Sequence, residues 1–309
     1  MAEQPDKTRA LPQQESARLM RLATYASTAT AAILITAKLM AWMITDAVSM
    51  LATLIDSTLD VLASMINLLA VRHALVPADR QHRFGHGKAE ALAGLGQATF
   101  ITGSAAFLLL EAVRRFFHPQ AVEIIGIGVG VMIFSIIATL VLLAIQHHVI
   151  EKTGSTAIRA DSLHYKTDVL VNASVIGALL LAFYGWPGFD PVFAIAIAIY
   201  ILYNAWEIAR ESVQHLMDQE LPDEERENIT SIVLGHRHVK GMHDLRTRRS
   251  GTTTFIQLHL ELDDELTLLR AHAIADAVEA EIRKAYPNAE VLIHEDPASL
   301  TEPQPVFNE

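Results

Sequence analysis

Two pairs of potential metal ligands lie within strongly apolar segments of this chain. Asp56 and Asp60 form one pair, and His164 and Asp168 form the other. In each pair the residues are four positions apart, a spacing that places both side chains on one face of an α-helix. Three carboxylates and one imidazole suit Zn²⁺ or a neighbouring divalent transition metal, whereas Ca²⁺ prefers more oxygens and Cu(I) prefers sulfur. The two pairs together predict one four-ligand metal site.

Carboxylates in such apolar segments are unfavourable unless something compensates their charge. On insertion scales each costs about 2.5–3.5 kcal/mol at the centre of a bilayer, so three cost on the order of 8–10 kcal/mol. Lys38 and Lys166 are the nearest cations in the sequence, and they are too few to neutralise three acids. A bound metal is the simpler compensation. The alternatives are helix-packing polar residues and a proton relay without metal.

The composition indicates a membrane protein. The chain has 309 residues, of which 51% are hydrophobic and 19% charged, which is too apolar for an ordinary soluble domain. Six segments reach the roughly 20 apolar residues that cross about 30 Å of hydrocarbon. These predicted transmembrane helices cover approximately residues 22–44, 47–71, 91–117, 122–146, 160–183 and 189–208. The second and fifth are the least apolar, and they carry the two ligand pairs.

The positions of the basic residues predict the orientation in the membrane. Lysine and arginine gather before the first segment and in the second and fourth connections, whereas the first and fifth connections have neither. By the positive-inside rule, both termini are expected on the cytoplasmic side. The polar N-terminal stretch, residues 1–21, has no apolar region with a cleavage site, so no signal peptide is predicted. The chain has no cysteine and therefore no thiolate metal site.

A second domain is predicted after the last apolar segment. From Gln214 onward there are 19 Asp and Glu against nine Lys and Arg, an acidic balance that disfavours a nucleic-acid partner. The pattern predicts a helix over 222–234, strands over 242–249 and 253–262, a helix over 266–286 and a strand over 289–294. This αββαβ order is typical of an α+β, ferredoxin-like domain. The expected organisation is an N-terminal segment (1–21), a six-helix membrane domain (22–212), a cytoplasmic domain (213–297) and a disordered tail (298–309).

Two further groups of residues have metal-binding chemistry. Asp79, His82 and His86 lie in the connection after the second segment, where they can bind one ion with a fourth position left to water. The C-terminal domain holds His243, His259, His272, His294 and Asp296, which the predicted αββαβ order can bring to one edge. Histidines on a polar surface without metal are the alternative for both groups.

Five motifs together resemble the cation diffusion facilitator family. They cover residues 56–60, 84–90, 161–168, 241–248 and 294–297, and the likeness extends from the first apolar segment to Pro297. The resemblance implies export of a divalent metal from the cytoplasm by proton antiport through alternating access. The implied cargo is Zn²⁺, with Cd²⁺, Fe²⁺ and Mn²⁺ left open. It also implies a homodimer in the bacterial inner membrane.

The resemblance also assigns roles to individual residues. It implies a transport site at Asp56, Asp60, His164 and Asp168, a loop site at Asp79, His82 and His86, and a two-metal site between protomers at His243, His259, His272, His294 and Asp296. An inter-subunit salt bridge would fall on Lys88 and Asp218, and a hydrophobic gate on Leu163.

Two other functions compete with an exporter. A membrane-tethered metal sensor would use the C-terminal histidines and would leave the acids of the membrane segments without a role. An intramembrane metallohydrolase needs a general base beside a metal-bound water, and the chain has no His-Glu-x-x-His motif. We therefore expect a transporter that is not an enzyme.

Overall fold

The computed structural model describes residues 12–45, 48–117, 126–184 and 190–300. Within them the chain divides into two compact units, one of residues 17–213 and one of the residues from Gln214 onward grouped with those up to Ser16. The first unit is entirely helical, and the second combines helices with a sheet. The division falls next to the predicted boundary after residue 212, because the apolar helical pattern ends there and the acidic domain begins.

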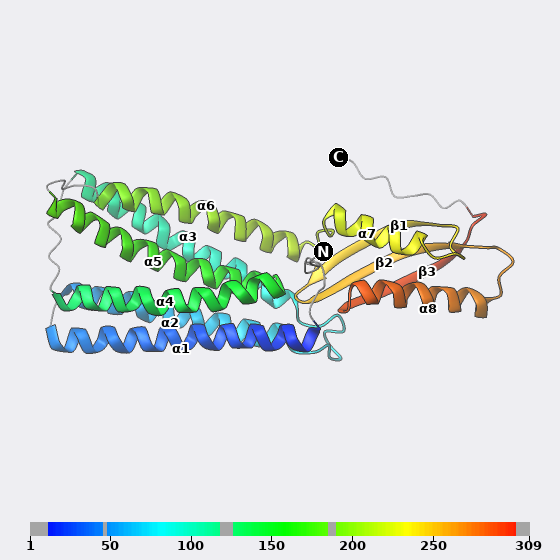
Figure 1. The fold of residues 1–309 in the computed structure, drawn as a ribbon, viewed down its shortest axis with the longest axis horizontal. Helices are drawn as coiled ribbons and strands as arrows, with labels where there is room; N and C mark the ends of the chain where they lie inside the picture. The colour runs from blue at the N-terminus through cyan, green and yellow to red at the C-terminus, as the bar shows by residue number, and fades with distance from the viewer. Residues whose placement is uncertain (1–11, 46–47, 118–125, 185–189, 301–309) are drawn as a thin grey trace, which may run out of the picture. The chain divides into compact units, whose positions relative to one another are not determined.

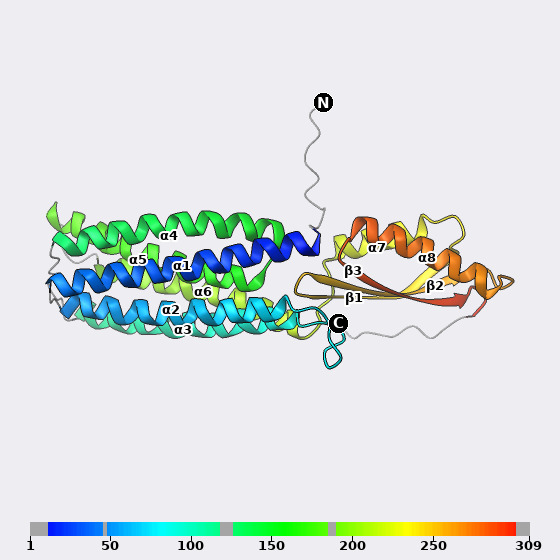
Figure 2. The same cartoon turned by 90° about the horizontal axis from the view of Figure 1, so that it is seen from below.

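Six long helices form the first unit and run side by side (Figures 1 and 2). They are α1 (Gln13–Thr45), α2 (Val48–Ala74), α3 (Lys88–Phe117), α4 (Gly126–Thr153), α5 (Thr156–Phe183) and α6 (Asp190–Leu216). The shortest have 27 residues, which at about 1.5 Å per residue gives roughly 40 Å, enough to cross a bilayer. The six predicted membrane segments are confirmed as helices.

The helices differ in how apolar they are. Among the described residues, segments of α1, α3, α4 and α6 are long and apolar enough to span a membrane. The remaining two, α2 and α5, are equally long but carry the predicted ligand pairs. The structure therefore confirms that both ligand pairs lie on long helices of this unit.

A three-stranded sheet with two helices forms the second unit. The elements follow the order α7 (Asp223–Leu234), β1 (Gly241–Ser250), β2 (Thr253–Leu262), α8 (Leu268–Ala285) and β3 (Ala289–Pro297). Strand β2 is central, pairing antiparallel with β1 and parallel with β3. Figure 2 shows α7 and α8 on the same side of the sheet. The predicted αββαβ domain is confirmed.

Alternation along β2 determines which face of the sheet is covered. Ile256, Leu258, Leu260 and Leu262 are at most 2% exposed, and they pack against buried residues of α7 and α8. The side chains between them belong to the opposite face, which the helices leave open. His259 is one of these residues. The sheet therefore separates an apolar core from a polar open face.

Some predicted boundaries differ from the observed ones. Helix α1 begins at Gln13 rather than at residue 22, because the residues before the apolar run continue the helix. The predicted tail is also structured at its start, since Ala298 donates a backbone hydrogen bond to Leu262 (2.7 Å) and the Ser299 N–H bonds Asp264 Oδ1 (3.1 Å). Residues 301–309 lie outside the described part.

Candidate metal centres

Asp60, His164 and Asp168 converge within the helical unit. Asp60 belongs to α2, and the other two residues belong to α5. His164 Nε2 lies 3.1 Å from Asp60 Oδ1, and one donor atom from each of the three side chains lies within 4.8 Å of the others. A tetrahedral zinc ion with bonds of about 2.0–2.1 Å holds its donors roughly 3.4 Å apart. Small side-chain movements would therefore close this group around an ion.

The group includes three of the four predicted ligands. The fourth, Asp56, belongs to α2 one turn before Asp60, but its side chain lies outside the described part of the structure. Asp60 and His164 are only 8% and 6% exposed. Because burying an acid and an imidazole is unfavourable, their burial favours a role that requires both. Asp56 remains a predicted ligand.

Apolar packing lies directly beside this group. Leu163, the residue before His164, is 7% exposed and belongs to a buried cluster of residues from α3, α5 and α6. The ring of Phe100 on α3 contacts His164 edge-on, with ring centroids 6.0 Å apart. The candidate site is therefore bordered by packed hydrophobic side chains on the α3 side.

Glu90 caps the start of α5, the helix that carries two of the four predicted transport-site ligands. This α3 residue is 5% exposed and accepts hydrogen bonds from the Ser155 hydroxyl and from the backbone N–H groups of Thr156 and Ala157, at the start of α5. Ser155 Oγ also accepts a hydrogen bond from the backbone N–H of Ile158 (3.2 Å). A carboxylate at a helix N-terminus satisfies free N–H groups and complements the helix dipole. Glu90 thereby fixes where α5 begins relative to α3.

Removing this cap is expected to destabilise the protein. Glu90→Ala leaves buried donors of Ser155, Thr156 and Ala157 unpaired, and we expect a loss of about 1–3 kcal/mol in unfolding free energy. Unfolding of the full-length protein in detergent measures it. The control is Glu151→Ala on α4, whose side chain is 64% exposed and which should change stability little. Equal stability of Glu90→Ala and the wild type would contradict the capping role.

Two further polar residues of α5 escaped the sequence analysis. Asp161 and Tyr165 are both 0% exposed. The Tyr165 hydroxyl lies 2.7 Å from Ser64 Oγ on α2, and it donates to the backbone oxygen of Ser27 on α1 (3.2 Å). Their spacing from His164 was an available signal, because residues 161, 164, 165 and 168 share one helix face.

The loop between α2 and α3 brings its three predicted ligands together. The His82 and His86 rings lie 3.2 Å apart, from Nδ1 to Nε2, and Asp79 oxygens lie 3.5 Å from each of those nitrogens. Asp79 Oδ1 also accepts hydrogen bonds from the backbone N–H groups of Gln81 (2.8 Å) and His82 (2.6 Å). These bonds lower the pKa of the Asp79 carboxyl, since they favour its charged form. The loop presents an ionised ligand.

Asp79→Asn separates metal binding from loop structure. The asparagine oxygen can still accept both backbone hydrogen bonds, so the turn should persist. Loss of the charged ligand should weaken Zn²⁺ binding at the loop by more than about ten-fold, the smallest loss usual even for outer-shell partners. Calorimetric titration measures this in a background carrying Asp60→Asn and Asp296→Asn. Asp223→Asn, a change at an 89% exposed side chain, is the control, and equal Zn²⁺ affinity in the two variants would exclude Asp79 as a ligand.

A third group lies on the open face of the sheet, where His243, His259 and His294 occupy paired positions on β1, β2 and β3. Asp296 is 6% exposed and contacts all three rings. Its oxygens lie 2.7 Å from His259 Nδ1, 3.2 Å from His294 Nε2 and 3.7 Å from His243 Nε2. His243 Nε2 is buried without a hydrogen-bond partner among the described residues. This free nitrogen beside a carboxylate fits a metal ion, which would take its lone pair.

Acidic neighbours orient the histidines of this group. Glu261 Oε1 lies 2.8 Å from His243 Nδ1, an arrangement that leaves Nε2 to bind metal. The β1–β2 register shifts between His243 and Arg246, and Asp244 within this irregularity has φ +46°. Such irregularities often redirect side chains near functional sites. Glu261 was missed by the sequence analysis, although its place two residues after His259 puts it on the same face.

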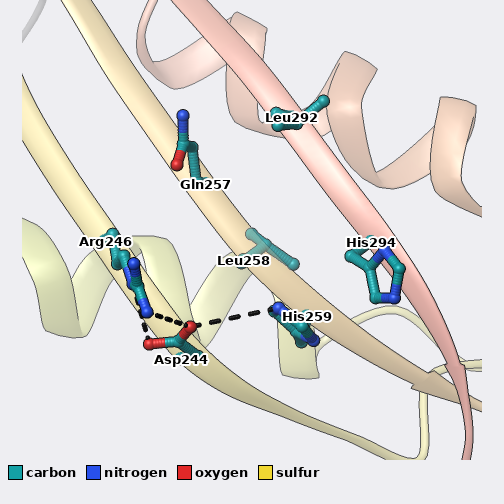
Figure 3. A pocket seen from close by; sticks show the side chains of 7 residues that line it. All are labelled: Asp244, Arg246, Gln257, Leu258, His259, Leu292 and His294. Carbon is teal, nitrogen blue, oxygen red and sulfur yellow. Dashed lines mark hydrogen bonds and ion pairs between the residues drawn. The ribbon is translucent and has the colours of Figure 1, made fainter. Parts of the chain in front are cut away.

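Figure 3 shows a shallow pocket at the edge of this group. It has a volume of about 210 Å³, and His259 and His294 line it together with Asp244. Asp244 Oδ2 lies 3.9 Å from His259 Nε2 and also pairs with Arg246 (2.9 Å). The His294 side chain is 64% exposed, so it lies on the open face in contact with solvent.

His272 does not join this group within one chain. It lies on α8, which covers the core face of the sheet, whereas His243 and His259 belong to the open face. Its side chain is 65% exposed and lies 3.5 Å from Asp276, one turn further along α8. Within one chain His272 therefore lies apart from the other four residues, and its place in the two-metal site between protomers stays a prediction.

Lys88 and Asp218 belong to different units. Lys88 is the first residue of α3. Asp218 follows α6, has φ +56° and pairs with Arg248 of β1 at 3.2 Å. Their predicted inter-subunit salt bridge involves a second chain, so it remains a prediction.

Comparison with known families follows the same division of the chain. The model of the cation efflux transmembrane domain matches residues 24–217, and the model of the cation efflux protein cytoplasmic domain matches residues 221–298. The chain belongs to the cation diffusion facilitator family. This cation diffusion facilitator is therefore a helical membrane protein with a cytoplasmic α+β domain, as the fold predicted.

Similar proteins are described as efflux pumps. The chain is 48% identical over 287 residues to the cation-efflux pump FieF of Klebsiella pneumoniae, covering 93% of this chain and 96% of the pump. It is also 48% identical over 284 residues to the pump of the same name from Serratia proteamaculans, covering 92% and 95%. Cation efflux is thus the function in the names of the proteins that this chain resembles over nearly its whole length.

Two of the similar solved structures each span about a quarter of this chain. A metal-bound C-terminal domain of the CzcD transporter from Thermotoga maritima is 27% identical and is covered completely, but it spans 26% of this chain, with a TM-score of 0.25. A structure described as the zinc form of the putative zinc transporter CzrB is 30% identical, covers 28% of this chain and 99% of its own, and has a TM-score of 0.26.

Proposed function

We propose that this protein exports Zn²⁺ from the cytoplasm in exchange for protons, by alternating access. Cd²⁺, Fe²⁺ and Mn²⁺ are further candidate cargoes. The observation that carries the proposal is the buried group of Asp60, His164 and Asp168 between two membrane helices. With Asp56 it offers three carboxylates and one imidazole, a donor set without the thiolates that are frequent in closed structural zinc sites. Such a site suits an ion that must leave again.

Proton exchange follows from the chemistry of these ligands. A carboxylate or imidazole must be unprotonated to hold a metal, so loading the site displaces protons and protonation weakens it. We assign loading to the cytoplasmic side and release to the outer side. Leu163, packed against α3 and α6 directly before His164, is the proposed hydrophobic gate. Movement of α5 relative to these helices would open the site to one side at a time.

We place the protein in the bacterial inner membrane from its family membership, and both termini in the cytoplasm from the distribution of lysine and arginine. We further propose a homodimer in which Lys88 pairs with Asp218 of a second copy. The group at His243, His259, His294 and Asp296 would hold regulatory or structural metal near that interface. His272 would complete the set across the interface, since the sheet separates it from the group in its own chain.

A flux experiment in proteoliposomes tests the proposal. Uptake of Zn²⁺, Cd²⁺, Fe²⁺ and Mn²⁺ is measured with and without an imposed pH gradient. We expect Zn²⁺ flux that accelerates with the gradient and a counterflow of protons. Metal flux that ignores the gradient would refute the antiport. Metal binding without any flux would favour the alternative, a membrane-tethered sensor that uses the group on the sheet.

A further inference from the structure

A buried carboxylate outside the metal-binding group joins three helices. Asp161 of α5 is 0% exposed. Its Oδ1 accepts a hydrogen bond from Gln97 Nε2 on α3 (3.2 Å), and its Oδ2 accepts one from Gln146 Nε2 on α4 (2.7 Å). Hydrogen bonds to an ionised acceptor are stronger than neutral ones. We call these residues the Asp161 junction.

The junction lies on the same face of α5 as the metal ligands. Asp161 precedes His164 by three residues and Asp168 by seven, spacings that place all three side chains on one helix stripe. At about 1.5 Å per residue, Asp161 is roughly 4.5 Å along the axis from His164. A rotation of α5 about its axis would therefore move the junction and the ligands together.

The side-chain amide of Gln146 is oriented by its hydrogen bond to the Asp161 carboxylate. Gln146 is 0% exposed, and its Oε1 has no hydrogen-bond partner among the described residues. A buried acceptor without a partner is costly. The amide is nevertheless turned so that its nitrogen meets Asp161. Three apolar side chains of similar volume would pack at these positions without leaving a buried acceptor unpaired. Packing between the helices therefore does not by itself explain why an aspartate and two glutamines are found here.

Asp161 is not itself placed to bind the metal. Among the described residues, the group with mutually close donors contains Asp60, His164 and Asp168. Both Asp161 oxygens are already occupied by amide donors. Asp161 can therefore act on the metal without binding it, either through its charge or through the position of α5, and the variants below separate the two.

We propose that Asp161 is a positioning residue for the transport site, and this inference rests on the proposed function. The junction fixes the rotation of α5 against α3 and α4, which directs His164 at Asp60 across the gap to α2. Tyr165, one turn after Asp161, links α5 to α2 through the hydrogen bond between its hydroxyl and Ser64. Asp161 contacts α3 and α4 and Tyr165 contacts α2 and α1, so the two residues hold α5 against four helices.

Two substitutions at Asp161 separate this role from others. Asp161→Ala removes the acceptor, and we expect the Zn²⁺ concentration for half-maximal flux to rise about ten-fold, in the range seen when outer-shell partners are lost. Asp161→Asn should restore it to within about three-fold of wild type. Its oxygen can accept from Gln97, and its nitrogen can donate to Gln146 Oε1 once that amide turns over.

Binding measurements make the test independent of transport. Zn²⁺ is titrated calorimetrically into the full-length protein in detergent, in a background carrying His86→Ala and Asp296→Asn to silence the other groups. Affinity should follow the same order as the flux constants. If the wild type binds Zn²⁺ through Asp60 but does not move it, the proposed function fails, whereas the comparison of Asp161 variants still decides the positioning role.

The controls define what would overturn the proposal. Ser135→Ala changes another buried polar side chain of α4, whose hydroxyl has no partner among the described residues, and should leave affinity unchanged. Unaltered affinity in Asp161→Ala would refute positioning. So would an Asp161→Asn variant as weak as Asp161→Ala, because charge rather than geometry would then matter. Should Asp161→Ala fail to fold, Gln146→Ala opens one arm of the junction, and unchanged affinity there also refutes the proposal.

Discussion

Asp60→Asn is expected to abolish measurable Zn²⁺ efflux while the protein remains folded. Asparagine keeps the size of the side chain and can still bond His164, which lies 3.1 Å from Asp60 Oδ1. It removes the negative charge that a divalent ion needs in a site of low dielectric. Flux in proteoliposomes measures the loss of efflux. Elution as a single species in detergent shows that the variant is folded.

A matched control shows whether the effect belongs to the site. Glu207→Gln removes another negative charge from the helical unit, on α6, where the side chain is exposed and bonds Tyr203. It should transport at the wild-type rate. Wild-type flux in Asp60→Asn would mean that this group does not carry the ion, and the sensor hypothesis would gain support.

Asp296→Asn is expected to remove most of the stabilisation that Zn²⁺ gives to the cytoplasmic domain. Asp296 is the one side chain within 3.7 Å of three imidazoles in this group, so no other single change loosens it as much. A ligand at about 100 times its Kd stabilises a protein by about 2.7 kcal/mol, and the variant should lose the larger part of this gain. The difference in unfolding midpoint with Zn²⁺ and with a chelator reports it.

The neighbouring acid supplies the control for this prediction. Glu295→Gln changes a carboxylate one position away, which by strand alternation belongs to the other face of the sheet. Its zinc-dependent shift should equal that of the wild type. An undiminished shift in Asp296→Asn would remove this group from the list of metal sites.

The fold was predictable because its signals are local. Six apolar segments of sufficient length predicted six helices, and the alternation of Ile256, Leu258, Leu260 and Leu262 predicted a strand with one buried face. Helix ends were less predictable, since α1 continues to Gln13 through polar residues that carry no hydropathy signal.

The candidate sites were predictable where chemistry limits the choice. The i and i+4 spacing placed Asp60 and His164 each on a known helix face, but only the cost of burying acids argued that α2 and α5 meet. The spacing of Asp161 from His164 indicated a shared helix face, but spacing along one helix could not reveal the partners of Asp161 or Glu90 in other helices.

A diffraction experiment at the zinc absorption edge tests the central claim most directly. Crystals of the full-length protein grown with Zn²⁺ give an anomalous map in which each bound zinc ion appears as a peak. We predict a peak bonded to Asp60, His164 and Asp168, with Asp56 completing the tetrahedron, and its disappearance in Asp60→Asn. A wild-type map with zinc at the loop and on the sheet but with these side chains pointing apart and no peak between α2 and α5 would contradict the account.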